Sequence, residues 1–371
     1  MSNARTNAVG TLREQARRRE FGSLFDSELW WRDHYRDFES HGYRLRPRYH
    51  PDWEPSWKHS GMDFFRVEDG QPTLLPSAMD ATCNYDGKQV MLKSVPARRG
   101  QQELEIARRF SSPDLRRDSR NHCVPLLETL ELPDTLDQKL MVMPYLRPFD
   151  KPHFRTFGEF VAFFTQICDG LQFLHERNIA HRDCTANNIM LDPSGMYPDG
   201  FHPVKINRTR DFKGKAARYD RTQRPPRYYL IDFGLSRQYS SRNALDKPLR
   251  GGDKSAPEHQ NQNGRLCNPF HTDIYYLGNL IRERFLKKYY GFEFMEELVN
   301  AMTAVDPAKR PAIKEVVKKF SYIRNSLSEF KLRSLITSRR DPTLITTYRY
   351  TCQAIRTLQY IILQRPAIPD P

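Results

Sequence analysis

The most regular hydrophobic pattern in this chain lies between Phe157 and His175. Apolar side chains recur there at three- and four-residue steps, which places them along one face of an α-helix; they are Phe157, Phe160, Val161, Phe164, Ile167, Cys168, Leu171 and Leu174. We therefore predict a helix that is buried along this face. Further helices are predicted in the second half of the chain, for the segments TDIYYLGNLIRERFL, EFMEELVNAMTAV and AIKEVVKKF.

Strand patterns occur in the first half of the chain. The segments QVMLKSV (residues 89–95) and KLMVMPYL (residues 139–146) are short and apolar, with enough alternation to predict two strands. Between them, QQELEIARRF predicts one short helix. A strand-rich first half is thus followed by a helix-rich second half.

The first 72 residues differ in composition from the rest. Residues 1–25 carry four arginines between positions 13 and 19 and no apolar run, which predicts a flexible basic tail and not a targeting segment. Residues 26–72 are dense in aromatic residues, Arg and Pro. Such a segment can bind nucleic acid by stacking and charge, or it can wrap over a neighbouring domain. We favour wrapping, with Trp53, Pro55 and Trp57 among the packing residues.

Composition limits the class of protein. The 371 residues are 38% hydrophobic and 12% aromatic, enough to bury a core, and no apolar run approaches the roughly 20 residues that cross a bilayer. The net charge of +14 favours anionic partners without choosing among phosphates, acidic peptides and nucleic acid. Six scattered cysteines, with no close Cys-x-x-Cys pair, fit neither a zinc site nor a disulfide framework. We expect reduced thiols and a cytoplasmic or nuclear protein.

Two motifs follow the predicted long helix. HRDCTANNIML covers residues 181–191, and YYLIDFGLS covers residues 228–236. Together they resemble the catalytic loop and the metal-binding loop of eukaryotic-type protein kinases, in which an Asn follows the Asp of His-Arg-Asp by five positions and Asp-Phe-Gly comes later. A three-letter match alone is common by chance, whereas His-Arg-Asp, the Asn five positions after its Asp, and Asp-Phe-Gly in this order are specific.

The resemblance implies a role for each of these residues. Asp183 would accept or orient the proton of an attacking hydroxyl, and Arg182 would organise the activation segment. Asn188 and Asp232 would hold magnesium beside ATP, because Mg²⁺ prefers carboxylate and amide oxygens. Phosphoryl transfer depends on such positioning and on neutralising the charge of the phosphoryl oxygens.

The resemblance continues upstream of these loops. In VMLK, Lys93 would contact the phosphates of ATP while a glutamate of the following helix holds the lysine. Glu103 is the predicted glutamate, because it lies three residues before Ile106 and seven before Phe110, a spacing at which we expect a helical glutamate to face the cleft while the apolar residues face the lobe; Glu105 remains the alternative. The segment MVMPYL resembles the hinge that binds adenine, with lining residues Met143, Pro144, Tyr145 and Leu146.

Three downstream residues resemble parts that hold a protein kinase lobe together. SAPEH, TDIYYLGN and DPAKRP supply Glu258, Asp273 and Arg310, and the resemblance implies that Glu258 pairs with Arg310. The implied fold is a bilobal, α+β, protein kinase-like fold with a small β-rich N-lobe and a larger α-helical C-lobe. The expected ranges are 73–146 for the N-lobe and hinge, 147–320 for the C-lobe, and 321–371 for a C-terminal helical tail that packs through Leu327, Phe330 and Leu335.

The chain departs from the kinase pattern in several places. Only Gly87 precedes Lys93 where a glycine-rich loop should cover the phosphates. Thr185 stands where serine/threonine kinases have Lys, so the acceptor class is not readable from this motif. The basic, Pro- and Gly-containing insertion 192–227 is expected to be a solvated surface loop, although its charge could dock an acidic substrate or nucleic acid.

With the segments GYRLRPRYHPDWEPSW, NHCVP and RYYLIDFGLS, the chain is similar to an expanded fungal family of protein-kinase-like proteins. The resemblance implies an ATP- and Mg-dependent protein kinase that phosphorylates Ser or Thr more readily than Tyr. A pseudokinase or scaffold is the alternative, and a kinase-like enzyme acting on a small molecule is a third. We expect a protein substrate of unknown identity, no membrane and no nucleic acid as partners; the oligomeric state is left open.

Arg182 also predicts a form of regulation. A cation at this position calls for an anionic partner, which suggests a phosphate on the activation segment. The available acceptors there are Tyr239, Ser240 and Ser241.

Overall fold

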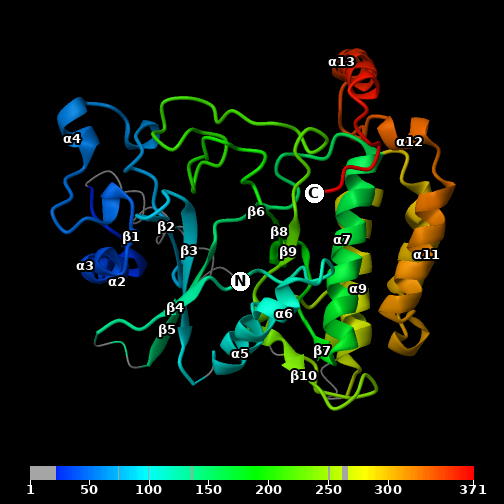
Figure 1. Cartoon of the computed structure of the whole chain (residues 1–371), viewed down its shortest axis with the longest axis horizontal. Coiled ribbons are helices and arrows are strands. Elements are labelled where there is room, and N and C mark those ends of the chain that lie inside the picture. Colours follow the sequence, from blue (N-terminus) through cyan, green and yellow to red (C-terminus); the bar gives the residue numbers. More distant parts are fainter. Residues whose placement is uncertain are drawn as a thin grey trace, which may run out of the picture. The chain divides into compact units, whose positions relative to one another are not determined.

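The computed structural model describes residues 22–371 except Leu74, Arg99, Asp134, Leu136, Arg250 and 261–265. Most of the predicted basic tail, residues 1–21, lies outside the described residues. The chain forms two compact units (Figure 1): unit 1 comprises residues 1–101, 126–145 and 197–218, and unit 2 comprises residues 102–125, 146–196 and 219–371. Compared with the expected lobes, residues 102–125 group with the larger unit and residues 197–218 with the smaller one.

Unit 1 is built on a five-stranded antiparallel sheet. Its strands are β1 (Tyr43–Arg44), β2 (Ala78–Cys83), β3 (Gln89–Pro96), β4 (Glu128–Leu130) and β5 (Gln138–Pro144), in the order β1-β2-β3-β5-β4. The two predicted strands are confirmed as β3 and β5. Lys93 lies in the middle of the sheet, opposite Ala78 of β2 and Met141 of β5.

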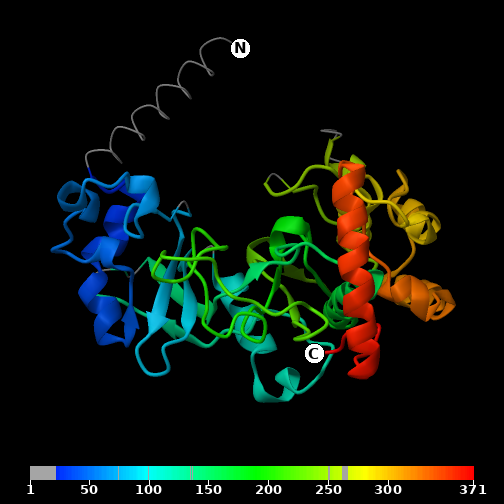
Figure 2. The same cartoon turned by 90° about the horizontal axis from the view of Figure 1, so that it is seen from above.

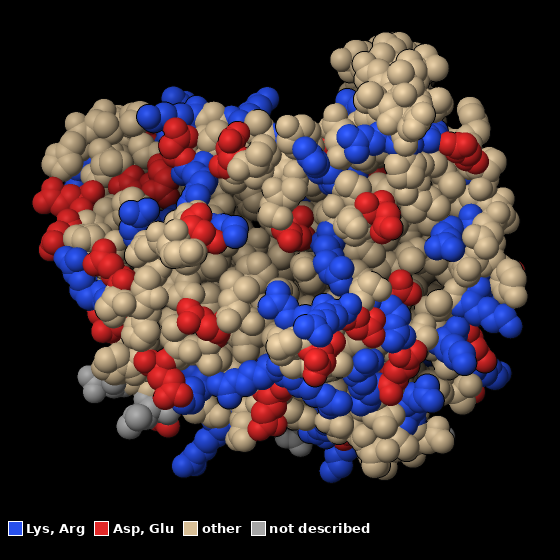
Figure 3. Space-filling view, viewed as in Figure 1, with Lys and Arg blue, Asp and Glu red and all other residues tan. Residues whose placement is uncertain are grey.

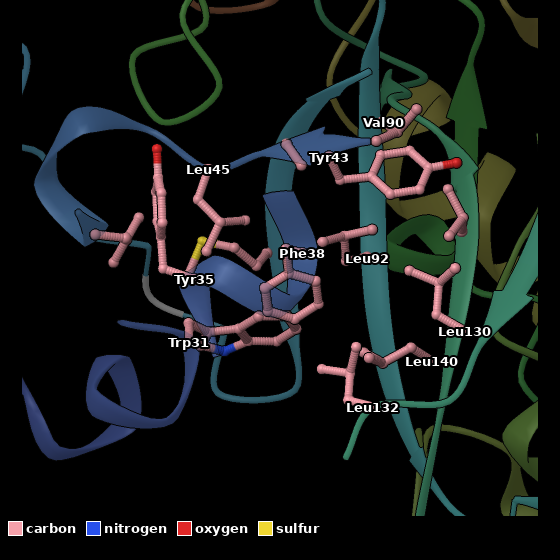
Figure 4. Close-up of a cluster of buried hydrophobic side chains, with 14 residues drawn as sticks. Trp31, Tyr35, Phe38, Tyr43, Leu45, Val90, Leu92, Leu130, Leu132 and Leu140 are labelled. Carbon is pink, nitrogen blue, oxygen red and sulfur yellow. The ribbon is translucent and has the colours of Figure 1, made fainter. Parts of the chain in front are cut away.

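The aromatic N-terminal extension packs on this sheet. It forms α2 (Asp26–Asp33), α3 (Tyr35–Ser40), the 3₁₀ turns η1 (Pro47–Tyr49) and η2 (Phe64–Arg66), and α4 (Ser56–Ser60). Trp31 and Phe38 are fully buried against apolar residues of β2, β3 and β5, as Figure 4 shows. A buried ion pair between Glu28 and Arg48, 2.8 Å apart, closes the extension on itself. The wrapping prediction is therefore confirmed for the extension, through Trp31 and Phe38. Of the residues named for it, Pro55 and Trp57 are buried and Trp53 is half-buried, and the rings of Trp53 and Trp57 contact Asp69 and Phe64 of the extension itself.

The insertion 192–227 is anchored at both ends, which corrects the expectation of a solvated loop. In unit 1, Phe201 and His202 are buried, and Nε2 of His202 lies 3.2 Å from Oε1 of Glu68. In unit 2, Arg221 is 1% exposed and donates to the carbonyl of Phe149 at 2.7 Å. Only part of the insertion is exposed as predicted, including Arg208, Lys213, Lys215 and Arg218.

Unit 2 is mainly helical. Its helices are α5 (Gln101–Phe110), α6 (Pro113–Arg116), α7 (Phe157–Glu176), α8 (Pro257–Gln260), α9 (Pro269–Ile281), α10 (Glu296–Met302), α11 (Ile313–Ser326), α12 (Glu329–Arg333) and α13 (Thr343–Ile362), with a π-helical turn η5 (Arg282–Leu286) and 3₁₀ turns η3 (Ala186–Asn188), η4 (Phe233–Leu235), η6 (Glu293–Met295) and η7 (Pro307–Lys309). Its short strands are β6 (Arg147–Pro148), β7 (Ile179–Ala180), β8 (Ile189–Leu191), β9 (Tyr228–Leu230) and β10 (Arg237–Gln238). They form a β6-β8-β9 sheet and a β7-β10 pair.

Helix α7 is the centre of unit 2 and confirms the most regular predicted helix. Thr156 caps its N-terminus by accepting a hydrogen bond from the N–H of Glu159. The helix packs against α11, α12 and β9, and its buried side chains lie on more than one face. A small β-rich unit and a larger helical unit confirm the expected fold class.

The C-terminal region departs from its prediction at one residue. Leu335 is buried, and Leu327 is half-buried, but Phe330 is 85% exposed. The segment ends in the 20-residue helix α13, which Figure 2 shows along its length. Among the described residues, no helix combines the length and apolar character needed to cross a membrane. All six cysteines are free thiols, as expected.

Candidate functional site

The predicted catalytic loop, residues 181–191 of unit 2, is held by one buried carboxylate. Asp273 of α9 accepts hydrogen bonds from the backbone N–H groups of His181 (2.8 Å) and Arg182 (2.7 Å), and its Oδ2 lies 2.9 Å from Nε2 of His175. These bonds fix Arg182 in a left-handed backbone conformation with φ of 68°, which is costly for a residue other than glycine. Asp273 therefore stabilises a strained backbone conformation in the loop that carries Asp183. This agrees with the structural role predicted for it.

Asp183 and Asn188 lie in direct contact. The amide nitrogen Nδ2 of Asn188 donates to both the backbone carbonyl and Oδ2 of Asp183, each at 2.9 Å. Burial raises the pKa of the Asp183 carboxyl to about 6, and the nearby charges of Asp232 and Asp253 act in the same direction. A carboxylate with a pKa near the working pH is suited to accept a proton from a hydroxyl.

The metal-loop motif folds over the catalytic loop. Asp232 has a φ of 61°, and its carboxylate accepts a hydrogen bond from the N–H of Gly234 at 3.3 Å. The side chain of Phe233 is 1% exposed. The centroid of its ring lies 5.3 Å from that of the His181 ring and 6.4 Å from that of the Phe110 ring in α5. This packing places Asp232 close enough to Asp183 for their charges to interact.

The donor set of this loop fits magnesium. Because Nδ2 of Asn188 uses its hydrogens on Asp183, the amide orientation is set and Oδ1 is turned the other way; within the described residues no donor bonds this oxygen. The amide oxygen of Asn188 and the carboxylate of Asp232 are hard ligands of the kind Mg²⁺ prefers. A divalent cation would also offset the repulsion between Asp183 and Asp232. No cluster of three or more His, Cys, Asp or Glu side chains suited to a metal occurs in the described parts of the chain.

The structure places the two candidate helix glutamates on different faces of α5. Glu103 is buried, whereas Glu105 is exposed. A Cβ atom at Gly234 would lie 3.3 Å from Oε2 of Glu103, so this carboxylate lies beside the metal loop. Lys93 is a half-buried residue of β3 in unit 1. Of the two glutamates, Glu103 is thus the one that is buried beside Gly234 of the Asp-Phe-Gly motif.

The predicted hinge coincides with the boundary between the units in the chain. Met143 and Pro144 end β5, and the boundary falls between Tyr145 and Leu146. The N–H of Tyr145 donates to the carbonyl of Gln89 in β3 at 3.2 Å. Successive backbone groups of a strand point in opposite directions, so the carbonyl of Pro144, the last residue of β5, points away from β3.

The expected glycine-rich loop is replaced by a longer segment. Gly87, the one candidate glycine, lies in the turn of the β2–β3 hairpin with φ of 69°. The connection from β1 to β2 runs from residue 45 to residue 77 and holds η1, α4 and η2. Backbone that folds into helical turns uses its N–H groups internally, so it cannot offer a run of bare N–H groups as a glycine-rich loop does.

Arg182 already has an anionic partner, which the sequence did not reveal. Its Nη2 lies 3.3 Å from Oδ2 of Asp246, and the same carboxylate binds Arg237 at 2.7 Å and the hydroxyl of Tyr239 at 2.7 Å. Asp246 is held by a two-bond bridge to the backbone of Cys267. The premise that Arg182 needs a phosphate partner is therefore wrong. This ion pair could not be predicted from the sequence, because Arg182 and Asp246 lie 64 positions apart in the chain.

The activation segment passes directly over Asp183. Gly252 has a φ of 71°, and a Cβ there would lie 2.9 Å from Leu235 and 3.5 Å from Cγ of Asp183. The next residue, Asp253, donates its N–H to Oδ1 of Asp183 at 3.4 Å. Beside it lies a cavity of about 180 Å³ lined by Thr185, Asp253, Ser255, Tyr276, Glu283 and Arg284, among others. Asn187, the neighbour of Asn188, also lines this cavity, which therefore lies next to the predicted catalytic loop.

The pairing implied for Glu258 and Arg310 is confirmed. Arg310 donates Nη1 and Nη2 to the two carboxylate oxygens of Glu258 at 2.7 and 2.8 Å. The exposed fractions of the two side chains are 0% for Arg310 and 8% for Glu258. A bidentate pair with this burial joins the end of the activation segment to the loop before α11.

Comparison with known proteins agrees with this geometry. Residues 120–293 match the model of the protein kinase domain. The chain is 31% identical over 136 residues to dual specificity protein kinase zakA of Dictyostelium discoideum, and 25% identical over 198 residues to serine/threonine-protein kinase WNG2 of Toxoplasma gondii. These alignments cover 37% and 51% of this chain but only 14% and 27% of the two relatives. Both the matched segment and the relatives support membership of the protein kinase superfamily.

Proposed function

We propose that this chain, in which residues 120–293 match the protein kinase domain, transfers the γ-phosphate of ATP to a hydroxyl of a protein substrate. The observation that carries the proposal is the contact of Asp183 with Asn188, with Asp232 beside it. In this arrangement a proton acceptor and two oxygen ligands for a cation share one loop cluster. Lys93 of unit 1 would contact the α- and β-phosphates, and Glu103 would hold the lysine.

The proposed reaction needs one proton acceptor. The acceptor oxygen forms a bond to the γ-phosphorus while the bond from that phosphorus to the β–γ bridging oxygen breaks, and ADP leaves. Asp183 takes the hydroxyl proton, which its raised pKa permits near neutral pH. Asn188 orients the Asp183 carboxylate and, with Asp232, would hold magnesium, which when bound neutralises charge on the phosphate oxygens. The backbone groups of Pro144 and Leu146 would bind adenine, beside Met143 and Tyr145.

The acceptor is proposed to be Ser or Thr in preference to Tyr. One matched relative is named a serine/threonine kinase and the other a dual specificity kinase. The similarity to a fungal family and the cytoplasmic or nuclear location rest on the sequence motifs and the free thiols, and remain predictions.

The test is phosphate transfer from labelled ATP, with magnesium, to the protein itself and to generic protein acceptors. Asp183→Asn keeps the shape of the side chain and the hydrogen bond from Asn188, so the variant should fold while transfer falls to background. Asp199→Asn, at an exposed aspartate of the insertion, is the matched control and should retain full transfer. Equal transfer by Asp183→Asn and the natural chain would refute the proposal.

A nucleotide-binding pseudokinase is the second candidate. The long β1–β2 connection favours it, because no glycine-rich loop covers the phosphates. In that case the natural chain and Asp183→Asn would both transfer phosphate only at background level. ATP would still raise the thermal unfolding temperature of both proteins, which distinguishes nucleotide binding from turnover.

A further inference from the structure

Helix α13 meets the rest of unit 2 with its polar face. Gln353 and Tyr360 are its buried residues. Nε2 of Gln353 donates to the carbonyl of Arg333 at 3.1 Å, and Nε of Arg356 lies 3.6 Å from Oδ2 of Asp220, which also accepts from the hydroxyl of Tyr360. Arg349, which pairs with Asp341, lies on the same side of the helix. From Arg349, the residues Gln353, Arg356 and Tyr360 follow at steps of four, three and four positions. One stripe of the helix is therefore anchored by hydrogen bonds and ion pairs.

The opposite face of α13 is apolar and exposed to solvent. The exposed fractions are 86% for Leu344, 71% for Tyr348, 56% for Ile355, 62% for Leu358 and 79% for Ile362. Figure 3 shows the projecting end of this helix with neither basic nor acidic side chains on its surface. A surface helix normally buries its apolar stripe and exposes its polar one. Here the order is reversed, and such an apolar patch marks an interaction surface.

We propose that α13 is a dimerisation helix that pairs with α13 of a second copy of this chain in antiparallel orientation. With Thr351, the exposed residues follow steps of four, three, four, three and four, the spacing of a coiled-coil seam. This spacing is the same from either end. A two-fold axis near residue 353 places Leu344 opposite Ile362, Tyr348 opposite Leu358 and Thr351 opposite Ile355, as a self-complementary interface requires.

Charge favours a second copy over other occupants. Between residues 343 and 362 the charged residues are Arg349 and Arg356, and both are engaged on the anchored face. The positions that flank the seam are uncharged: Ile345, Thr347, Cys352, Ala354, Gln359 and Ile361. Two copies thus meet without repulsion. An acidic or basic partner would find no complementary charge on this face. Helices that lie on membranes carry Lys or Arg on their polar face, but the two arginines of α13 already pair with Asp341 and Asp220.

The size of the surface and its order also fit dimerisation. A large apolar side chain buries on the order of 100 Å², so the seam and flanking residues of two copies would remove on the order of 1,000 Å² or more from water, close to a standard interface. The helix is about 30 Å long. It is already folded against unit 2, so association does not have to order it, which lowers the cost of binding.

The experiment measures the mass of the full chain by light scattering or sedimentation at micromolar concentration. We expect the natural chain at twice its 43.8 kDa mass and Leu358→Glu at the single mass, with circular dichroism showing that the variant is folded. Phe330→Glu, at an exposed apolar residue outside α13, is the matched control and should stay dimeric. A natural chain that is monomeric, with or without binding to anionic vesicles, or a dimer that survives Leu358→Glu, would overturn the proposal.

The antiparallel orientation of the two α13 helices can be tested separately. In an antiparallel pair the two Cys352 side chains flank the same side of the seam, whereas in a parallel pair they lie on opposite sides. Mild oxidation should therefore link the dimer covalently through Cys352, and Cys352→Ser should abolish the link while the dimer persists. A dimer that Leu358→Glu disrupts but that never cross-links through Cys352 would refute the antiparallel arrangement.

Discussion

The guanidinium of Arg182 lies 3.3 Å from the carboxylate of Asp246. The catalytic-loop arginine is thereby neutralised within the chain by a residue of the activation segment. Arg237 and Tyr239 bind the same carboxylate. A fixed carboxylate can order this segment as a phosphate would, without a kinase upstream.

Asp246→Asn should lower phosphate transfer about tenfold, because a charge-assisted hydrogen bond contributes roughly 1.5–3 kcal/mol. Ser240 and Ser241 are exposed and lie in the same segment. The double change Ser240→Ala with Ser241→Ala should leave the rate unchanged, and phosphatase treatment should have no effect. A fall in rate after either of these two treatments would show that the segment depends on phosphate after all.

Glu258→Gln should destabilise the protein by about 3–5 kcal/mol at neutral pH, because Arg310 is left buried without a counter-charge. Burial works against ionisation of Glu258, but the hydrogen bonds from Arg310 outweigh it and hold the pKa of this carboxyl below its usual 4.5. A lowered pKa in the folded state stabilises above the unfolded pKa and is lost as pH falls.

The difference in unfolding free energy between the natural chain and Glu258→Gln should therefore be full above about pH 5 and shrink below pH 4.5. Urea unfolding at several pH values measures it. Glu297→Gln, at an exposed residue of α10, is the control and should show no such difference. A constant difference down to pH 3 would contradict the assigned pKa direction.

Asn188→Ala should raise the magnesium concentration needed for half-maximal transfer by about tenfold or more, because one of the two proposed protein ligands of magnesium is lost. The same shift should appear in the magnesium dependence of thermal stabilisation by ATP, which does not require turnover. Asn187→Ala changes the exposed neighbour and serves as the control. Unchanged magnesium dependence in both assays would remove Asn188 from the metal site.

Arg221→Met should destabilise unit 2 by about 3 kcal/mol. The guanidinium donates to the carbonyls of Phe149 and His153 and to the hydroxyl of Tyr228, and it stacks 4.2 Å from the ring of Phe154. Its removal leaves buried carbonyls without a donor. Thermal unfolding measures the effect, with Arg218→Met at an exposed residue of the same insertion as the control. Equal stability of the two variants would mean that the insertion is not anchored by Arg221.

Much of the candidate site was predictable because its chemistry is local in the chain. Asp183 and Asn188 are five positions apart, and one 3₁₀ turn brings their side chains into contact. The periodicity of α7 and the apolar runs of β3 and β5 likewise specify their own secondary structure. Such features depend on neighbours within a few residues, so the sequence alone determines them.

Other features depend on partners far apart in the chain. Asp246 meets Arg182, and Arg221 is buried against Phe149, only because the fold brings distant segments together. Helix α13 shows most clearly what the sequence alone does not determine. Its pattern predicts an amphipathic helix, and the usual rule turns the apolar face inward. Asp220 and the carbonyl of Arg333 instead bind its polar stripe. Periodicity determines which residues share a face, but the surface that a helix meets decides which face is buried.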